Sequence, residues 1–328
     1  MKSTQLTRRQ ACKLLAGCVF SPCCSAIPTI SDCSSNNTPK SNQFKLNYII
    51  ASSMYGCMPL SEILPHVQKA GAKYIDIWPK IHGNQREQMD GIGHDKFAQM
   101  LDKHNVKLGI LTRYDLGPFG LQNELDVAQK FGTKIIITGS PPAKDITGNE
   151  LKKAVKQFAD KMKPHVEAAQ KASVTIGIEN HANALICSPE SILWFAEFTQ
   201  SQNTGIALAP YHLPQEPDLV AYIIKKLGRK LVHFYAWQHG QGCMRKMPKE
   251  LEMLQMPGYG PLDFVPIVNA LKQIKYHNWT SVFMHPTPRG IPILPTTEQV
   301  TEAINRSRVY LNNCITDHSF IADPKETT

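Results

Sequence analysis

From Phe44 onward, eight strand-like runs alternate with eight helix-like segments, and this alternation constrains the fold more than any other feature. The strand-like runs are short, apolar and rich in β-branched residues, as is typical of strands buried on both faces of a parallel sheet. They cover residues 46–51, 74–78, 106–112, 134–138, 174–179, 205–209, 231–236 and 281–285. The helix-like segments cover residues 60–70, 94–104, 121–131, 151–172, 189–200, 219–227, 262–274 and 298–311.

Eight such units in about 270 residues match the expected size of a (β/α)₈ TIM barrel. An open, doubly wound sheet is the alternative, and it usually carries a glycine-rich phosphate-binding turn after its first strand. The turn here, Ser52–Cys57, lacks that pattern. The sequence therefore predicts an α/β barrel as one domain over residues 44–315, with a C-terminal tail at 316–328. The insert 238–260 is predicted as an active-site loop or lid.

The strand at 174–179 ends in Glu179 and is followed by Asn180 and His181. Because all strands of a barrel end at one face, where such folds keep their chemistry, Glu179 is expected to share a pocket with the residues that follow the other strands. These are Trp78, Lys80, His82, Arg113, Tyr211, His212, Tyr235, Trp237, Gln238, His285 and Arg289.

Glu179, His212 and His285 are the predicted catalytic residues. Burial of an unpaired carboxylate is costly, so Glu179 is expected to be functional, although pairing with a basic side chain would also satisfy it. His212 and His285 are either metal ligands or acid–base groups, or they are ordinary satisfied polar residues. His181 is expected to support Glu179, and His233, inside its strand, is expected to be structural.

The remaining strand-end residues are assigned to substrate binding. Lys80, Arg113 and Arg289 either hold an anionic group or lie at the rim as solvated charges. Aromatic rings such as Trp78 and Trp237 beside polar groups suit the apolar faces and hydroxyl edges of a sugar. A small carbohydrate is therefore the expected partner.

The N-terminal residues predict export. Thr7–Lys13 resembles a twin-arginine signal, and the apolar segment after it, 14–20, is too short to span a bilayer permanently. Leu15–Cys18 resembles a lipobox, which would leave Cys18 as a lipid anchor. Residues 1–43 are predicted as an export signal and a linker without core-forming content, and the protein is expected in the periplasm or cell envelope.

Charge and cysteine content exclude several classes of protein. The net charge is +9, but residues 1–45 carry six Lys or Arg and one Asp, so +5 of it lies in the N-terminal segment. Nucleic-acid binding gains little support from the rest. Five of the nine cysteines lie in the first 33 residues, and no two form a CxxC pair. This argues against a zinc knuckle or a disulfide framework.

Residues 44–315 resemble the sugar phosphate isomerase/epimerase family of xylose-isomerase-like TIM barrels. The resemblance rests on Ile178–His181, Ala209–His212 and Val232–Tyr235 together with the order of strands. It implies a divalent metal held by a strand-five Glu, a strand-six Asp, a strand-seven His and a strand-eight Glu. It also implies proton transfer between carbons beside a carbonyl.

This chain departs from that pattern at three ligand positions, where it has Ala209, Tyr235 and Met284. One interpretation is that a rearranged set holds the metal, expected to be manganese, zinc, magnesium or cobalt. That set is Glu179, His212, Gln238 and His285. The other interpretation is that no metal binds and the site has a different chemistry.

The leading hypothesis is an exported isomerase, epimerase or lyase that acts on a non-phosphorylated sugar or keto-sugar, with Glu179 or His212 as the base. The alternative is a non-catalytic carbohydrate-binding protein on a barrel with a degenerate metal site. A DNA-repair endonuclease of the same barrel type needs a dense His/Asp/Glu cluster for three zinc ions, which this sequence lacks. The sequence does not determine the oligomeric state.

Overall fold

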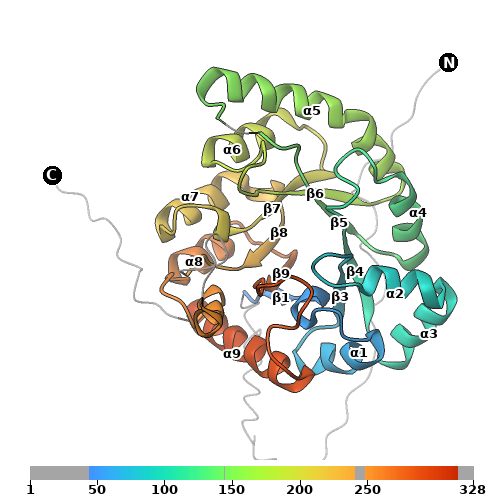
Figure 1. Cartoon of the computed structure of the whole chain (residues 1–328). Coiled ribbons are helices and arrows are strands. Elements are labelled where there is room, and N and C mark those ends of the chain that lie inside the picture. The colour runs from blue at the N-terminus through green and yellow to red at the C-terminus, as the bar shows by residue number, and fades with distance from the viewer. Residues whose placement is uncertain (1–43, 144, 241–247, 317–328) are drawn as a thin grey trace, which may run out of the picture. The chain divides into compact units, whose positions relative to one another are not determined.

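The structure, a computed structural model, describes residues 44–143, 145–240 and 248–316. This part of the chain forms a nine-stranded parallel sheet in the order β1-β9-β8-β7-β6-β5-β4-β3-β2 (Figure 1). The strands are β1 (Asn47–Tyr48), β2 (Ile50–Ala51), β3 (Tyr74–Ile77), β4 (Lys107–Thr112), β5 (Ile135–Gly139), β6 (Thr175–Glu179), β7 (Thr204–Leu208), β8 (Leu231–Ala236) and β9 (Trp279–Val282).

The first predicted strand closes the barrel. It is split at Ile49 into β1, which pairs with β9, and β2, which pairs with β3. The two ends of the sheet are therefore halves of one strand, and the Ile49 N–H still donates to the Thr280 carbonyl at 3.1 Å. The predicted (β/α)₈ barrel is confirmed, with nine strand segments where eight strands were expected.

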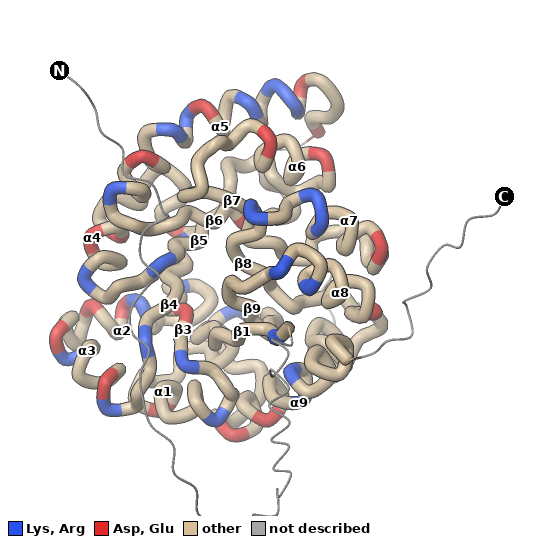
Figure 2. Tube along the Cα trace, turned by 180° about the vertical axis from the view of Figure 1, so that it is seen from behind, with Lys and Arg blue, Asp and Glu red and all other residues tan. Residues whose placement is uncertain are grey.

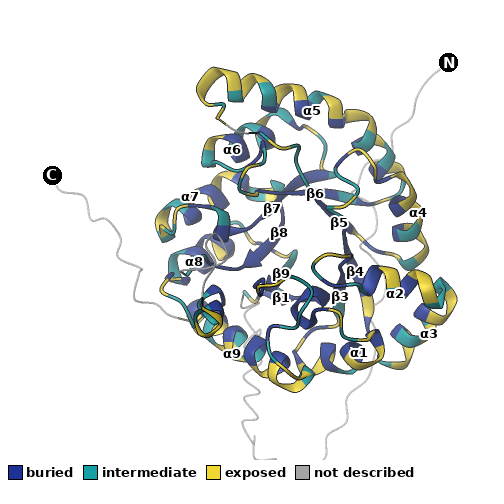
Figure 3. Ribbon diagram, in the orientation of Figure 1, coloured by how far each residue is buried: buried dark blue, intermediate teal, exposed yellow. Residues whose placement is uncertain are grey.

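Helices surround this barrel and bury their inner faces against it, while their outer faces are exposed (Figure 3). They are α1 (Leu60–Lys69), α2 (Gln85–Ile92), α3 (His94–Lys103), α4 (Gln122–Phe131), α5 (Gly148–Lys171), α6 (Pro189–Phe198), α7 (Pro217–Leu227), α8 (Val265–Gln273) and α9 (Thr297–Thr316). Helix α2 was not predicted, because Met89 is the only buried apolar residue of an otherwise polar segment. None of the helices in the described ranges is long and apolar enough to cross a membrane.

One predicted boundary is wrong in a way that affects the site. The last strand was placed at 281–285, but β9 ends at Val282. The Met284 N–H bonds to Met54 Sδ at 3.2 Å and the His285 N–H bonds to Gln255 Oε1 at 3.2 Å. Because these two N–H groups bond to side chains, the backbone leaves the ladder and His285 lies on a loop.

The register of the sheet aligns residues across the middle of the barrel. Glu179 on β6 pairs with Gly139 on β5 and Ala207 on β7, and Ala207 pairs in turn with His233 on β8. Small residues on β5 and β7 therefore flank the acid at the end of β6.

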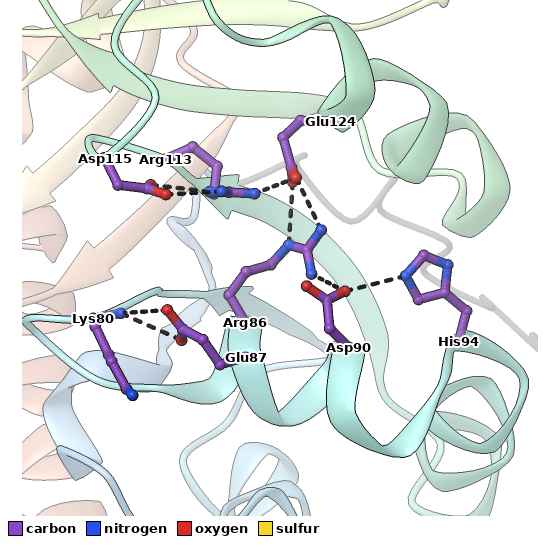
Figure 4. Close-up of polar contacts among 8 residues, drawn as sticks. All are labelled: Lys80, Arg86, Glu87, Asp90, His94, Arg113, Asp115 and Glu124. Carbon is purple, nitrogen blue, oxygen red and sulfur yellow. Dashed lines mark hydrogen bonds and ion pairs between the residues drawn. The ribbon is translucent and has the colours of Figure 1, made fainter.

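A buried ion-pair network joins α2, β4 and α4 (Figure 4). The Arg86 guanidinium donates to both oxygens of Glu124, at 2.8 and 3.2 Å, and also pairs with Asp90. Arg113 pairs with the same Glu124 and donates to Asp115 at 2.8 and 3.0 Å. Glu124, whose side chain is 4% exposed, is thus the shared anion of two arginines.

Replacing Glu124 by glutamine is expected to destabilise the barrel by about 2–3 kcal/mol, because two guanidinium groups lose their buried counter-charge while each keeps one outer partner. Urea denaturation measures the change. The matched control is Asp90→Asn: the Asp90 side chain is 56% exposed, and its loss is expected to cost less than about 1 kcal/mol. Equal losses for the two variants would contradict the central role of Glu124.

Candidate functional site

A cavity of about 280 Å³ opens at the carboxyl ends of the strands. Its walls come from the loops after β3, β4, β8 and β9 and from the ends of β5 and β6. The lining residues are His82, Tyr114, Gly139, Ser140, Glu179, His181, Ala184, Trp237, His285 and Arg289. Six of these ten were predicted from the strand ends, so the residues that follow distant strands do share one pocket.

His212 lies directly behind Glu179. Its Nε2 is 3.7 Å from Glu179 Oε1, and neither ring nitrogen has a hydrogen-bond partner among the described residues. The side chains of His212 and Glu179 are 3% and 5% exposed. A buried imidazole with both nitrogens unpaired is unusual in a folded protein, which points to a partner outside the described residues.

Burial sets the charge of this pair. Desolvation raises the pKa of Glu179 well above 4.5; Arg289 opposes the shift and the charge of Asp76 adds to it. Desolvation also lowers the pKa of His212 to about 2, with His181 and Arg289 contributing in the same direction. Both shifts disfavour charge on the buried pair, so burial favours a neutral carboxylic acid beside a neutral imidazole over two ions.

The other imidazoles of the cavity are neutral for the same reason. Desolvation lowers the pKa of His82 to about 3 and that of His285 well below 6.5, and the nearby Arg289 adds to both shifts. The pKa of His181 is lowered by desolvation as well. Arg289 donates through Nη1 to His82 Nδ1 at 2.9 Å, and it is the only arginine or lysine among the ten lining residues.

Trp237 and Tyr114 line the cavity, and other aromatic rings are buried in contact with Trp237 or His285. Tyr211 stacks on Trp237 with ring centroids 3.9 Å apart and an interplanar angle of 10°. Trp78 stacks on Phe283 at 5.2 Å and meets the edge of His285. Of these four rings, only Trp237 lines the cavity, where an aromatic ring suits the C–H side of a sugar.

Asn180 supports the site rather than lining it. Its side-chain amide donates to the Ala209 carbonyl at 3.0 Å and accepts from the Ala209 N–H at 2.7 Å. These two bonds hold the chain between β7 and His212 against the end of β6. The His181 ring, expected to support Glu179, instead contacts the Ala182 carbonyl through Nδ1 at 2.8 Å.

Eight of the predicted residues do not line the cavity. Five of them have buried side chains close to the strand ends: Trp78, Asn180, Tyr211, His212 and Tyr235. The other three are Lys80, Arg113 and Gln238. Lys80 is exposed, and its backbone N–H bonds to the Glu87 carboxylate (Figure 4). Arg113 belongs to the ion-pair network around Glu124. Gln238 is fully buried and uses both ends of its amide: it donates to the Met256 carbonyl at 2.8 Å and accepts from the Leu262 N–H at 2.8 Å.

Asp76 on β3 is a buried acid that the strand-end analysis missed. It accepts hydrogen bonds from Trp78 Nε1 at 2.7 Å and from Thr112 Oγ1 at 2.9 Å, and none of its surface is exposed. Desolvation raises its pKa to about 8, opposed by those two hydrogen bonds. The available signal was an acid inside the apolar run Ile75–Ile77, where burial is expected on both faces.

Gln255 is a second residue that sequence reasoning missed. Its Oε1 accepts from Trp237 Nε1 at 3.0 Å and from the His285 N–H at 3.2 Å, and its Nε2 donates to the His285 carbonyl at 2.9 Å. The segment Lys249–Gln255, inside the predicted insert, therefore fixes two walls of the cavity. Residues 241–247 of that insert lie outside the described residues.

The side chains present do not fit the four-ligand metal site that the resemblance implies. Ala209 offers a methyl group where the pattern has a carboxylate, and Met284 is fully buried against Met54. Gln238 of the rearranged set has its amide engaged on both sides. Within the described ranges, no group of three or more His, Cys, Asp or Glu side chains could hold a metal ion.

The surface charge is mixed rather than one-sided. Six Lys are interspersed with two Glu and one Asp along α5, the longest helix of the described residues (Figure 2). This pattern is typical of a solvated face and gives no sign of a basic stripe on that helix.

Comparison with known proteins identifies the fold. The structure resembles L-ribulose 3-epimerase (15% identity, 86% of this chain and 100% of that chain, TM-score 0.63). It also resembles the IolI protein with a binding zinc atom (16% identity, 81% and 98%, TM-score 0.62). A third similar structure is D-psicose 3-epimerase with D-tagatose from Clostridium cellulolyticum H10 (13% identity, 82% and 99%, TM-score 0.61).

At these identities the likeness establishes the fold alone, and no curated protein matches the chain. The family model described as "Xylose isomerase-like TIM barrel" matches residues 64–308, which is most of the chain. The protein therefore belongs to the xylose isomerase-like TIM barrel family.

Proposed function

We propose that this protein is an isomerase or epimerase that moves a proton at the carbon beside a carbonyl group of a sugar or keto-sugar. The observation that carries the proposal is the neutral Glu179–His212 contact, 3.7 Å long, at an aromatic-walled cavity of about 280 Å³. A carboxyl whose pKa is raised toward neutrality can both give and accept a proton at working pH. The structural likeness to two sugar epimerases is consistent with this reaction class.

The reaction breaks one C–H bond beside the carbonyl, and the electron pair moves to the carbonyl oxygen to give an enediolate. Return of a proton to the opposite face of the same carbon gives the epimer, and return to the former carbonyl carbon, with a proton moved between the two oxygens, gives the isomer. Glu179 is the proton-carrying group in this scheme, and His212 is its partner. The scheme routes no step through a metal, because no group of three or more His, Cys, Asp or Glu side chains in the described part of the chain fits one.

We also propose that the protein acts outside the cytoplasm on a non-phosphorylated sugar. The support is the sequence Thr7–Lys13 and the apolar segment that follows it, all of which lies outside the described residues. Fractionation of cells that express the full chain tests this: recovery in the periplasm or envelope is expected, and purely cytoplasmic recovery contradicts it.

The test of the reaction is solvent-proton exchange. The full-length protein is incubated in D₂O with D-tagatose and other free ketohexoses, and proton NMR follows loss of signal at the carbon beside the carbonyl. We expect exchange together with a new sugar, and an unchanged rate after exhaustive dialysis against a chelator. A rate abolished by the chelator and restored by manganese would contradict the metal-free scheme.

A carbohydrate-binding protein without turnover is the second candidate, favoured by the loss of ligand side chains at Ala209 and Met284. Calorimetry with the same sugars distinguishes the two. Binding without exchange for every sugar tested would support the binding protein and overturn the enzyme.

A further inference from the structure

Two histidines of the cavity each have one ring nitrogen bonded to a partner that can only accept, or only donate, a hydrogen bond. His181 Nδ1 lies 2.8 Å from the Ala182 carbonyl oxygen, and His82 Nδ1 lies 2.9 Å from Arg289 Nη1. Both rings and the guanidinium line the same cavity. The chemistry of these partners determines which ring nitrogen carries the proton.

A carbonyl oxygen only accepts hydrogen bonds, so His181 Nδ1 must carry the hydrogen. The neutral ring then has a free lone pair on Nε2. A guanidinium only donates, so His82 Nδ1 must accept, and the neutral ring carries its hydrogen on Nε2. Since desolvation lowers the pKa of both rings, the neutral forms are the relevant ones near pH 7. Nε2 of His181 is therefore fixed as a hydrogen-bond acceptor, and Nε2 of His82 is fixed as a donor.

We infer that His181 Nε2 is the base that takes the proton from the substrate carbon, and that the Arg289–His82 pair binds the carbonyl oxygen through N–H donors. The inference rests on the proposed function and divides its proton transfer between two groups: His181 takes the proton from the carbon, and Glu179, the proton-carrying group of the proposed scheme, returns one. The C–H bond breaks, an N–H bond forms at His181 Nε2, and the electron pair moves to the oxygen. That oxygen then faces the guanidinium and the His82 Nε2–H.

The neighbouring groups are consistent with this division of roles. His181 is exposed, whereas Glu179 is buried and has a raised pKa. Among the described residues that line the cavity, Arg289 alone carries a permanent positive charge, which would stabilise an enediolate in place of a metal. Glu179, His212 and His285 also face these rings, and burial keeps each of them uncharged near neutral pH.

The first measurement needs no substrate. Long-range proton–nitrogen correlation spectra of histidine-labelled protein report the tautomer of each ring, and His181→Gln and His82→Gln assign the signals. We expect the Nδ1–H tautomer for His181 and the Nε2–H tautomer for His82 at pH 7. The opposite tautomer, or a charged ring, at either position overturns the inference.

The second measurement uses the D₂O exchange assay with D-tagatose and the same set of ketohexoses. His181→Gln is expected to lower the exchange rate about 100-fold, because the amide is not a base. The control His277→Gln changes an exposed histidine far from the cavity and is expected to match the wild type. Circular dichroism melts of both variants verify folding.

Arg289→Lys and Arg289→Gln test the oxygen-binding pair. Lysine keeps the charge but not the donor geometry, so exchange is expected to fall with Arg289→Lys and to fall further with Arg289→Gln. If the wild type shows exchange and the exchange rate of His181→Gln is within threefold of it, the base assignment is overturned and the proposed function stays intact. Absence of exchange in the wild type, by contrast, overturns both.

Discussion

Glu179→Gln is expected to lower the rate of solvent-proton exchange by about 10²–10⁴-fold, the usual contribution of a positioned proton-transfer group. Glutamine has the shape of the protonated acid, so the buried site keeps its packing. It cannot release a proton, however, and so cannot exchange one with the substrate. The rate in D₂O with D-tagatose and related ketohexoses measures the effect.

The stability of this variant separates chemistry from folding. Because Glu179 is neutral when folded, glutamine should leave the urea midpoint near pH 7 close to, or above, that of the wild type. The matched control is Glu197→Gln, an exposed glutamate on α6, which is expected to change neither rate nor midpoint. Turnover unchanged in Glu179→Gln would remove Glu179 from the mechanism.

Much of the cavity was predictable because the strands themselves were predictable. Short apolar runs mark the strands, a barrel gathers their carboxyl ends, and so the residues after distant strands meet at one mouth. Glu179, His82 and Arg289 come from three such ends and line one cavity. Position along the chain was enough to bring them together.

Hydrogen-bond partners were not predictable in the same way, because tertiary contacts set them. Arg113 follows a strand as the pattern requires, yet it turns to Glu124 on the next helix. Gln238 follows another strand, yet the N–H of Leu262 and the carbonyl of Met256 take up its amide. The end of a strand predicts where the backbone places a side chain. It does not predict whether a neighbouring group already bonds to that side chain.

The acid inside β3 shows the converse limit. Asp76 precedes the end of its strand, so a search of post-strand residues passes over it, although its backbone position makes it fully buried. Its partners, Trp78 on the same segment and Thr112 on β4, are polar groups in apolar surroundings. An acid in a buried strand needs such donors or a proton, and here it has both.

The stability of the wild type is expected to fall as the pH rises, and Asp76→Asn is expected to remove much of that fall. The carboxyl of an exposed aspartate has an ordinary pKa of 3.8, and that of Asp76 has a pKa of about 8 in the folded protein. Between these values the folded chain holds a proton that the unfolded chain has released. Stability is therefore fully present below about pH 4 and falls by about 1.4 kcal/mol per pH unit until about pH 8. Asparagine, which does not titrate, lacks this loss.

Asparagine also reproduces the neutral carboxyl: its oxygen can accept from Trp78 Nε1 and its amide can donate to Thr112 Oγ1. Burial raises the pKa of Glu179 too, so a smaller slope of the same sign remains in the variant. Urea denaturation at pH 4, 6 and 8 measures the difference, with the exposed Asp126→Asn on α4 as control. The free energy of unfolding of Asp76→Asn is expected to exceed that of the wild type by an amount that grows from pH 4 to pH 8, because only the wild type titrates at this position. Parallel curves for wild type and Asp76→Asn would mean that Asp76 is already ionised in the folded barrel.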